Sequence, residues 1–176
     1  MHHTYKILSL LLDYPTGELK DALPGLMAVI GEEGGLNQSQ CAKLRQFLDY
    51  AMPLTLADWQ KHYVQLFDFT QNGNLYLFDH VYGDSRERGQ AMVDLADMYM
   101  KSGFTPRPDE LPDYLPLFLE YLSLLENPDD SGKLLKEVSA ILENMKKALE
   151  KKETPYSFLL DILCSINEMK GAEAAT

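Results

Sequence analysis

The segment LLKEVSAILENMKKAL, residues 134–149, shows most clearly how this chain folds. Its apolar side chains recur at intervals of three and four residues, at Leu134, Leu135, Val138, Ile141, Leu142, Met145 and Leu149. That spacing places them on one face of an α-helix and leaves lysine and glutamate on the other. The segment therefore predicts an amphipathic helix packed against other helices.

The same periodicity continues on both sides of this segment. We expect further helices at about residues 5–13, 18–30, 39–51, 55–67, 84–102, 113–125 and 155–169. Thr55-x-x-Asp58 has the form of a helix N-terminal cap, while Pro15, Pro53 and Gly103 are placed to end helices. No segment alternates in the manner of a strand, so the sequence predicts an all-α bundle of about seven or eight helices.

Length and composition predict one domain. A chain of 176 residues, 45% of them hydrophobic, can bury a continuous core. We expect a single helical domain over residues 1–170 and a frayed tail over residues 171–176, which are mostly small.

The charge of the chain ranks its possible partners. A formal net charge of −11 disfavours nucleic acid, which demands an excess of lysine and arginine. It fits either a basic or amphipathic partner or simple colloidal stability. No stretch approaches the roughly 18 apolar residues of a membrane span, and the first residues do not form a signal peptide. We therefore expect a cytoplasmic protein without membrane insertion.

Residues that could carry catalysis are few. Cys41 and Cys164 lie outside any CxxC spacing, and the sequence contains no GxSxG, Walker, HExxH or Cys/His cluster. His62 and His80 are the only histidines beyond the two that follow Met1. We expect no enzymatic activity, no catalytic residue, no metal and no cofactor.

The first dense block is LYLFDHVYGDSRERGQAMVDL, residues 75–95. Aromatic, acidic and basic side chains crowd the start of a helix, where a partner can meet free backbone N–H groups. A purely structural interpretation is also open. His80 can be a satisfied core histidine, Asp84 and Glu87 can form a capping box, and Arg86 and Arg88 can pair with acids such as Asp79.

The second block is ELPDYLPLFLEYL, residues 110–122. It has more leucines and aromatic residues than one buried stripe needs, so it predicts either a groove-lining helix or a helix buried all round. Between Pro106 and Asp130 seven acids accompany a single base, Arg107. An apolar groove with an acidic rim would suit a positively charged amphipathic helix.

Together the two blocks closely resemble the signature segments of the NarJ proteins, the delta or assembly subunits of respiratory nitrate reductase, within the TorD/DmsD group of molybdoenzyme chaperones. KILSLLLDYP, residues 6–15, and YVQLFD, residues 63–68, extend the resemblance in the same order. It implies a TorD/DmsD-like fold. It also implies a system-specific chaperone that binds the N-terminal segment of the nitrate reductase catalytic subunit and holds the apo-subunit for molybdenum cofactor insertion and membrane assembly.

The resemblance also implies contact residues. In the first block we expect partner contacts from His80, Asp84, Arg86 and Arg88, and in the second from Asp113, Leu117, Phe118, Glu120 and Tyr121. The cofactor insertion machinery is a further possible partner. The alternative is a chaperone for a dimethyl sulfoxide or trimethylamine oxide reductase, although GDSRERGQAM favours the nitrate reductase branch.

The chain departs from the family pattern in two respects. Tyr82 and Tyr114 stand where some members have histidine, so a role of those histidines does not carry over. Many members continue for several tens of residues past the last helix, whereas this sequence stops at Thr176. We expect either a naturally short member or a trimmed end.

Overall fold

The computed structural model describes residues 2–67, 74–83 and 85–173, with side chains up to Ile166. Its helices are α1 (His2–Leu12), α2 (Gly17–Ala22), the 3-10 helix η1 (Leu23–Gly25), α3 (Leu26–Glu33), α4 (Gln38–Ala51), α5 (Leu56–Phe67), α6 (Asp79–Tyr82), α7 (Arg86–Lys101), α8 (Leu115–Leu124), α9 (Pro128–Glu137), α10 (Ser139–Glu150) and α11 (Tyr156–Glu173). Within these described ranges there is no β-strand, and the prediction of an all-α fold is confirmed.

Two of the predicted helices are divided. The helix expected over residues 18–30 becomes α2, η1 and α3, because Pro24 lies in the first turn of η1 and cannot supply an N–H to a continuous helix. The segment 134–149 breaks at Val138, which ends α9 and begins α10. The break lets the two halves bury their apolar faces separately: α9 packs on α8 and α11, and α10 packs on α11 and α6.

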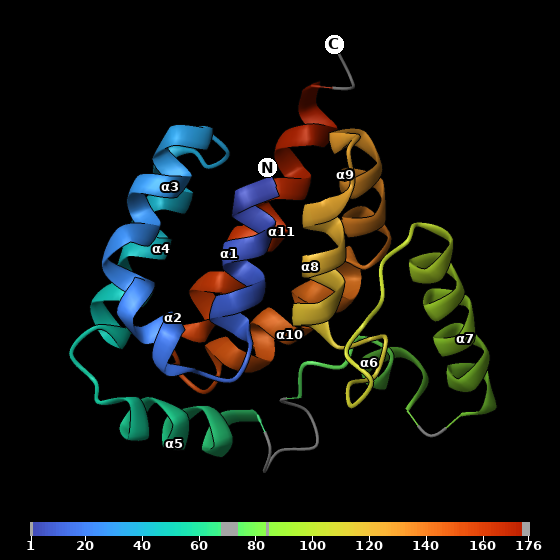
Figure 1. Ribbon diagram of the computed structural model, residues 1–176, viewed down its shortest axis with the longest axis horizontal. Coiled ribbons are helices and arrows are strands. Elements are labelled where there is room, and N and C mark those ends of the chain that lie inside the picture. The colour runs from blue at the N-terminus through green and yellow to red at the C-terminus, as the bar shows by residue number, and fades with distance from the viewer. Residues whose placement is uncertain (1, 68–73, 84, 174–176) are drawn as a thin grey trace.

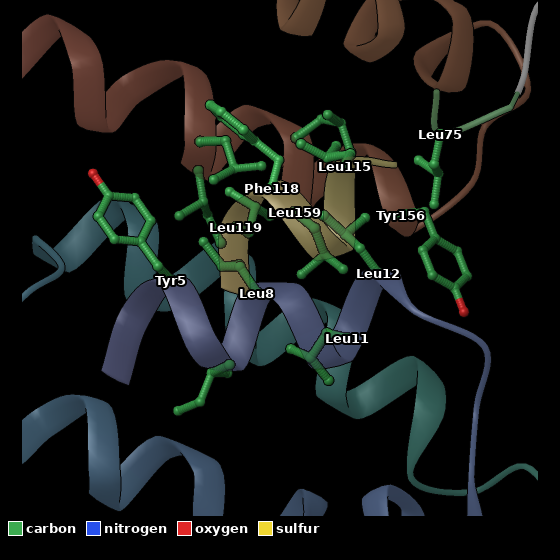
Figure 2. Packing of buried hydrophobic residues seen from close by; sticks show 14 of the residues in the cluster. Tyr5, Leu8, Leu11, Leu12, Leu75, Leu115, Phe118, Leu119, Tyr156 and Leu159 are labelled. Carbon is green, nitrogen blue, oxygen red and sulfur yellow. The ribbon is translucent and has the colours of Figure 1, made fainter. Parts of the chain in front are cut away.

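The core lies where α1, α8 and α11 run beside one another, as Figure 1 shows in blue, yellow and red. Leu8 and Leu12 of α1 meet Leu115 and Leu119 of α8, with Leu159 of α11 alongside (Figure 2), and all five side chains are fully buried. Burying one leucine contributes about 1.5–3 kcal/mol. This central layer accounts for a large part of the stability of the bundle.

The predicted cap of α5 is confirmed. The Asp58 backbone N–H donates to the Thr55 hydroxyl at 3.1 Å, satisfying one of the free donors at the helix start. The cap sets the start of α5, which carries Trp59 into the core against Phe47.

Helix α7 stands at the edge of the bundle, on the right in Figure 1. Its buried side chains among the described residues are Leu95 and Tyr99. Glycines with positive φ flank it, Gly83 at +51° and Gly103 at +76°, so the predicted stop at Gly103 is confirmed. Few of its side chains are therefore buried in the core.

At the C-terminus, α11 continues to Glu173. The helix therefore extends three residues beyond residue 170, the expected end of the ordered domain. Residues 174–176 of the predicted tail lie outside the described residues.

Candidate functional site

The two signature blocks pair directly in space. Tyr76 and Tyr114 form an isolated antiparallel bridge. Beside it the Leu77 N–H donates to the Asp113 carbonyl at 2.9 Å, and the Leu115 N–H donates to the Leu75 carbonyl at 2.8 Å. The start of the first block is thereby fixed against the residues that lead into α8.

Asp113 is the polar centre of this pairing. Its side chain is fully buried, and Oδ2 accepts a hydrogen bond from the Phe78 N–H at 3.0 Å. Arg88 Nη2 lies 3.8 Å from the same oxygen. Burial raises the pKa of the Asp113 carboxyl, an effect that the Phe78 hydrogen bond and the Arg88 charge only partly offset.

The other polar residues of the first block form a network around Asp79. Arg88 makes an ion pair with the Asp79 carboxylate, as the structural interpretation of the sequence anticipated. Asn74 Nδ2 donates to Asp79 Oδ2 at 2.6 Å, and the half-buried His80 donates from Nε2 to the Asn74 carbonyl at 3.1 Å. His80, Arg88 and Asp113, three of the predicted contact residues, thus belong to one network that holds the two blocks together.

An apolar groove of about 530 Å³ opens beside this network. Leu77, Phe78, Val81 and Tyr82 line it from the first block, and Ala91, Leu95 and Met98 from α7. The opposite wall comes from Leu134 of α9, from Val138, and from Ala140 and Ile141 of α10, while Phe118 of α8 completes the lining. Its size and lining are those of a recognition site for apolar side chains.

The charges in the groove have one sign. Asp94 of α7 and Glu137 of α9 line it, and no lysine or arginine occurs among the lining residues that the structure describes. The Gln90 amide donates to Asp94 Oδ1 at 2.8 Å, which fixes that carboxylate. An apolar surface with two carboxylates favours an occupant that carries a basic residue beside its apolar ones.

A second, smaller hollow of about 280 Å³ is polar and aromatic. Asp13, Glu110 and Arg107 line it together with Tyr14, Tyr63, Phe67, Tyr76 and Tyr114. The Tyr114 hydroxyl donates to Asp13 Oδ1 at 3.1 Å, and Arg107 Nη2 donates to Asp13 Oδ2 at 2.9 Å. The basic side chain among these residues is therefore already neutralised by an acid.

The apolar residues predicted for contact lie deeper than a contact surface. Leu117 and Tyr121 are 1% and 3% exposed, and the Tyr121 hydroxyl is 2.8 Å from the Ser102 Oγ. Phe118 is 3% exposed but contributes to the groove lining. The alternative of a helix buried nearly all round describes most of α8, and Phe118 is the α8 residue that lines the groove.

The remaining predicted residues are dispersed. Glu120 faces α1, where it makes an ion pair with Lys6, so it lies apart from the groove-lining residues. Arg86 is exposed at the start of α7. Asp84 lies outside the described residues, and so does the capping box with Glu87 that the structural interpretation left open.

Several groove residues were missed by the sequence analysis. They are Val81 and Tyr82 of α6, Met98 of α7, and Leu134, Glu137 and Ile141 of the α9–α10 wall. The 134–149 pattern did mark the apolar ones as one face of a helix, without indicating that part of that face stays uncovered. Val81, which lines the groove, has 53% of its surface exposed.

In the part of the chain that the structure describes, no three His, Cys, Asp or Glu side chains are grouped to hold a metal ion. None of the described helices is long and apolar enough to cross a membrane.

Fold and groove together define an all-helical bundle with an open apolar groove. Residues 33–160 match the family model for the nitrate reductase delta subunit. The chain is 36% identical over 160 residues to the nitrate reductase molybdenum cofactor assembly chaperone NarJ of Escherichia coli K12, covering 91% of this chain and 67% of that protein. It is also 36% identical over 168 residues to the Bacillus subtilis (strain 168) protein named "Probable nitrate reductase molybdenum cofactor assembly chaperone NarJ", covering 96% and 90%.

Among solved structures, a protein from Archaeoglobus fulgidus named for redox enzyme maturation superposes with a TM-score of 0.67 at 24% identity, covering 96% of this chain and 94% of that one. That likeness supports the fold. The chain belongs to the nitrate reductase delta subunit family, and the two relatives described above are named as molybdenum cofactor assembly chaperones. The resemblance to the NarJ proteins and the expectation that the chain is not an enzyme are therefore confirmed.

Proposed function

We propose that this chain is a nitrate reductase assembly chaperone that binds the N-terminal segment of the catalytic subunit in the apolar groove. It holds the apo-subunit in the cytoplasm until the molybdenum cofactor is inserted and membrane assembly proceeds. The observation that carries this proposal is the groove itself: an apolar site of about 530 Å³ with two carboxylates, next to the paired signature blocks.

The groove suits one face of an amphipathic helix. Apolar residues recurring every three or four positions along such a helix would contact Val81, Met98 and Ile141. A basic residue at its edge would approach Asp94 or Glu137. Because these carboxylates border solvent, each contributes modestly, about 0.5–1 kcal/mol, and chiefly to selectivity.

The predicted contact residues take different parts in this proposal. Phe118 provides apolar contact area in the groove. Asp113, Arg88 and His80 hold the first block and α7 in place, and Leu117 and Tyr121 support α8 from the core. Arg86, Asp84 and Glu120 remain candidates for contacts with parts of the apo-subunit outside the groove.

Calorimetric titration with a peptide of roughly 15 residues, about four helical turns, from the start of the cognate catalytic subunit tests the proposal. We expect micromolar or tighter binding that weakens with added salt. The corresponding peptide of a trimethylamine oxide reductase serves as the competitor, and equal affinity for it would contradict a nitrate reductase-specific role.

A matched pair of substitutions tests whether the peptide binds in the groove. Val81 lines the groove and is 53% exposed, whereas Val93 of α7 does not line it and is 54% exposed. Val81→Lys should weaken binding at least about tenfold, or 1.4 kcal/mol, because it puts an ammonium group among apolar contacts. Val93→Lys should leave the affinity within about twofold. Equal effects of the two substitutions would mean that the groove is not the binding site.

Two double variants test the electrostatic contribution of the groove carboxylates to peptide binding. Asp94→Asn with Glu137→Gln removes two charges from the groove, and Glu18→Gln with Asp21→Asn removes two exposed charges from α2. The first double variant should lose about five- to tenfold in affinity at low salt, and the second much less. Indistinguishable affinities would mean that the groove carboxylates contribute no more to binding than other surface charges do.

A further inference from the structure

The network around Asp79 contains a buried hydrogen-bond donor and a buried hydrogen-bond acceptor that are both unpaired among the described residues. Among the described residues, the Arg88 Nε–H has no acceptor and Asp113 Oδ1 has no donor. Both atoms are buried, and their side chains approach to 3.8 Å between Nη2 and Oδ2. That separation is too long for a hydrogen bond, although the two chemical groups match.

A guanidinium can satisfy both groups at once. Its Nε–H and one Nη–H form a fork that fits the two oxygens of a carboxylate. A movement of Arg88 by roughly 1 Å would bring Nη2 to the usual charged hydrogen-bond length of about 2.8 Å from Asp113 Oδ2, and a rotation of the guanidinium would be needed to turn Nε toward Oδ1. Burial raises the pKa of Asp113, as expected for a carboxylate that lacks such a partner here.

Arg88 is now held by the other acid of the network. Its Nη1 makes the ion pair with Asp79 of α6. Asp79 also accepts the Asn74 amide at 2.6 Å, so it keeps a donor if Arg88 leaves. The competing partners lie on different elements, Asp79 on α6 and Asp113 just before α8, while Arg88 itself is in the first turn of α7.

We propose that Arg88 is a positioning residue that exchanges Asp79 for Asp113, and that this exchange draws α7 toward α8 and narrows the groove. In the structure Arg88 Nη1 makes the close ion pair with Asp79 while Nη2 lies 3.8 Å from Asp113 Oδ2, and the groove is open. The glycines with positive φ at both ends of α7, Gly83 and Gly103, allow the helix to move as a unit. The groove wall then has two discrete arrangements, one with Arg88 paired to Asp79 and one with Arg88 paired to Asp113.

The Arg88 Nε–H itself reports the exchange. Its NMR resonance, assigned by its loss in Arg88→Lys, gives the rate of hydrogen exchange with solvent. In Asp79→Asn we expect that rate to fall at least tenfold, because Arg88 then pairs bidentately with Asp113. If Arg88 served only to tie α7 to α6, the same substitution would release the guanidinium, and a faster rate would overturn the proposal.

The isosteric variant Asp113→Asn should change the Nε–H exchange rate in the opposite direction. Asp113→Asn retains an oxygen that can accept from Phe78 but abolishes the charged pairing, so the Nε–H should exchange at least twofold faster than in the unmodified chain. An unchanged or slower rate would contradict the exchange. Glu120→Gln is the control, because it removes an ion pair of α8 with Lys6 outside the network and should leave the rate unaltered.

The consequence for the partner rests on the proposed function. Because the Asp79-paired arrangement has the open groove, Asp79→Asn should weaken peptide binding about five- to tenfold, and Asp113→Asn should strengthen it. Two losses of similar size would overturn this consequence. A chain that binds no peptide in any form would defeat the proposed function, while the Nε–H rates would still decide whether Arg88 exchanges partners.

Discussion

The indole Nε1–H of Trp59 donates a hydrogen bond of 2.8 Å to the hydroxyl of Tyr156, although 97 positions of sequence separate them. Both side chains are fully buried. The bond ties α5, next to the first signature block, to the start of α11 in the core. It lies within a cluster of aromatic rings, since Tyr156 also contacts Phe47 and Phe67 edge-on, with ring centres 5.0 and 5.1 Å apart.

We predict that Tyr156→Phe destabilises the fold by about 1–3 kcal/mol, because it leaves a buried indole N–H without an acceptor. Trp59 is the single tryptophan, so urea unfolding followed by its fluorescence measures the loss directly. Tyr50→Phe is the control, since its hydroxyl contacts His62 at the exposed edge of the cluster and should cost at most about 0.5 kcal/mol. Equal losses in the two variants would show that the hydrogen bond to the indole contributes no more stability than the exposed Tyr50 hydroxyl does.

Tyr114→Phe should cost about 1 kcal/mol of unfolding free energy. The Tyr114 hydroxyl is buried between the Tyr63 hydroxyl at 2.9 Å and Asp13 Oδ1 at 3.1 Å. The loss is limited because Asp13 keeps Arg107 and Tyr63 keeps the Leu12 carbonyl. Chemical denaturation checks this value against Tyr14→Phe, whose ring is 45% exposed. A Tyr114 variant as stable as the control would rule out a contribution from the network.

The Glu33 carboxylate should stabilise the fold in a pH-dependent way. Partial burial alone would raise its pKa, but hydrogen bonds, among them those from the Thr4 hydroxyl and from the His3 and Thr4 N–H groups, lower that pKa to about 2. A carboxyl whose pKa falls on folding stabilises above its unfolded pKa of about 4.5 and loses that contribution as the pH falls toward 2.

We therefore expect Glu33→Gln to cost about 1 kcal/mol at pH 7, a value discounted for solvent screening. The difference from the unmodified chain should shrink between about pH 4.5 and pH 2, the window set by the two pKa values. Denaturation at a series of pH values measures it, with the exposed Glu32→Gln as control. A difference that does not vary with pH would assign the cost to lost packing.

The two cysteines should differ in reactivity. Burial, with a contribution from Glu143, raises the pKa of the Cys164 thiol to about 12, so almost no thiolate forms at pH 8. Cys41 is half-buried. Titration with a thiol reagent at pH 8 should modify one cysteine in the native protein and both in denaturant. Cys41→Ser should abolish the native reaction. A fast native reaction in that variant would show that Cys164 is accessible.

The sequence alone determined the fold class, most helix ends and the family. These follow from local physics: the Thr55 hydroxyl caps a backbone N–H three residues away, and Gly103 ends α7 because it adopts a positive φ without steric cost. The signature blocks were recognised because their order and spacing are properties of the chain itself. None of these inferences required knowing what lies across the core.

Only the tertiary structure decided the site. Residues far apart in sequence, such as Val81 and Ile141, line the same groove, and periodicity cannot distinguish an apolar face that is covered from one that stays open. For the same reason Leu117 was predicted as a contact residue, although α1 and α9 pack against its helix and its side chain is buried. The partners of Glu120, Arg88 and Asp113 likewise depend on which helices meet, since charged pairing acts through space and not along the chain.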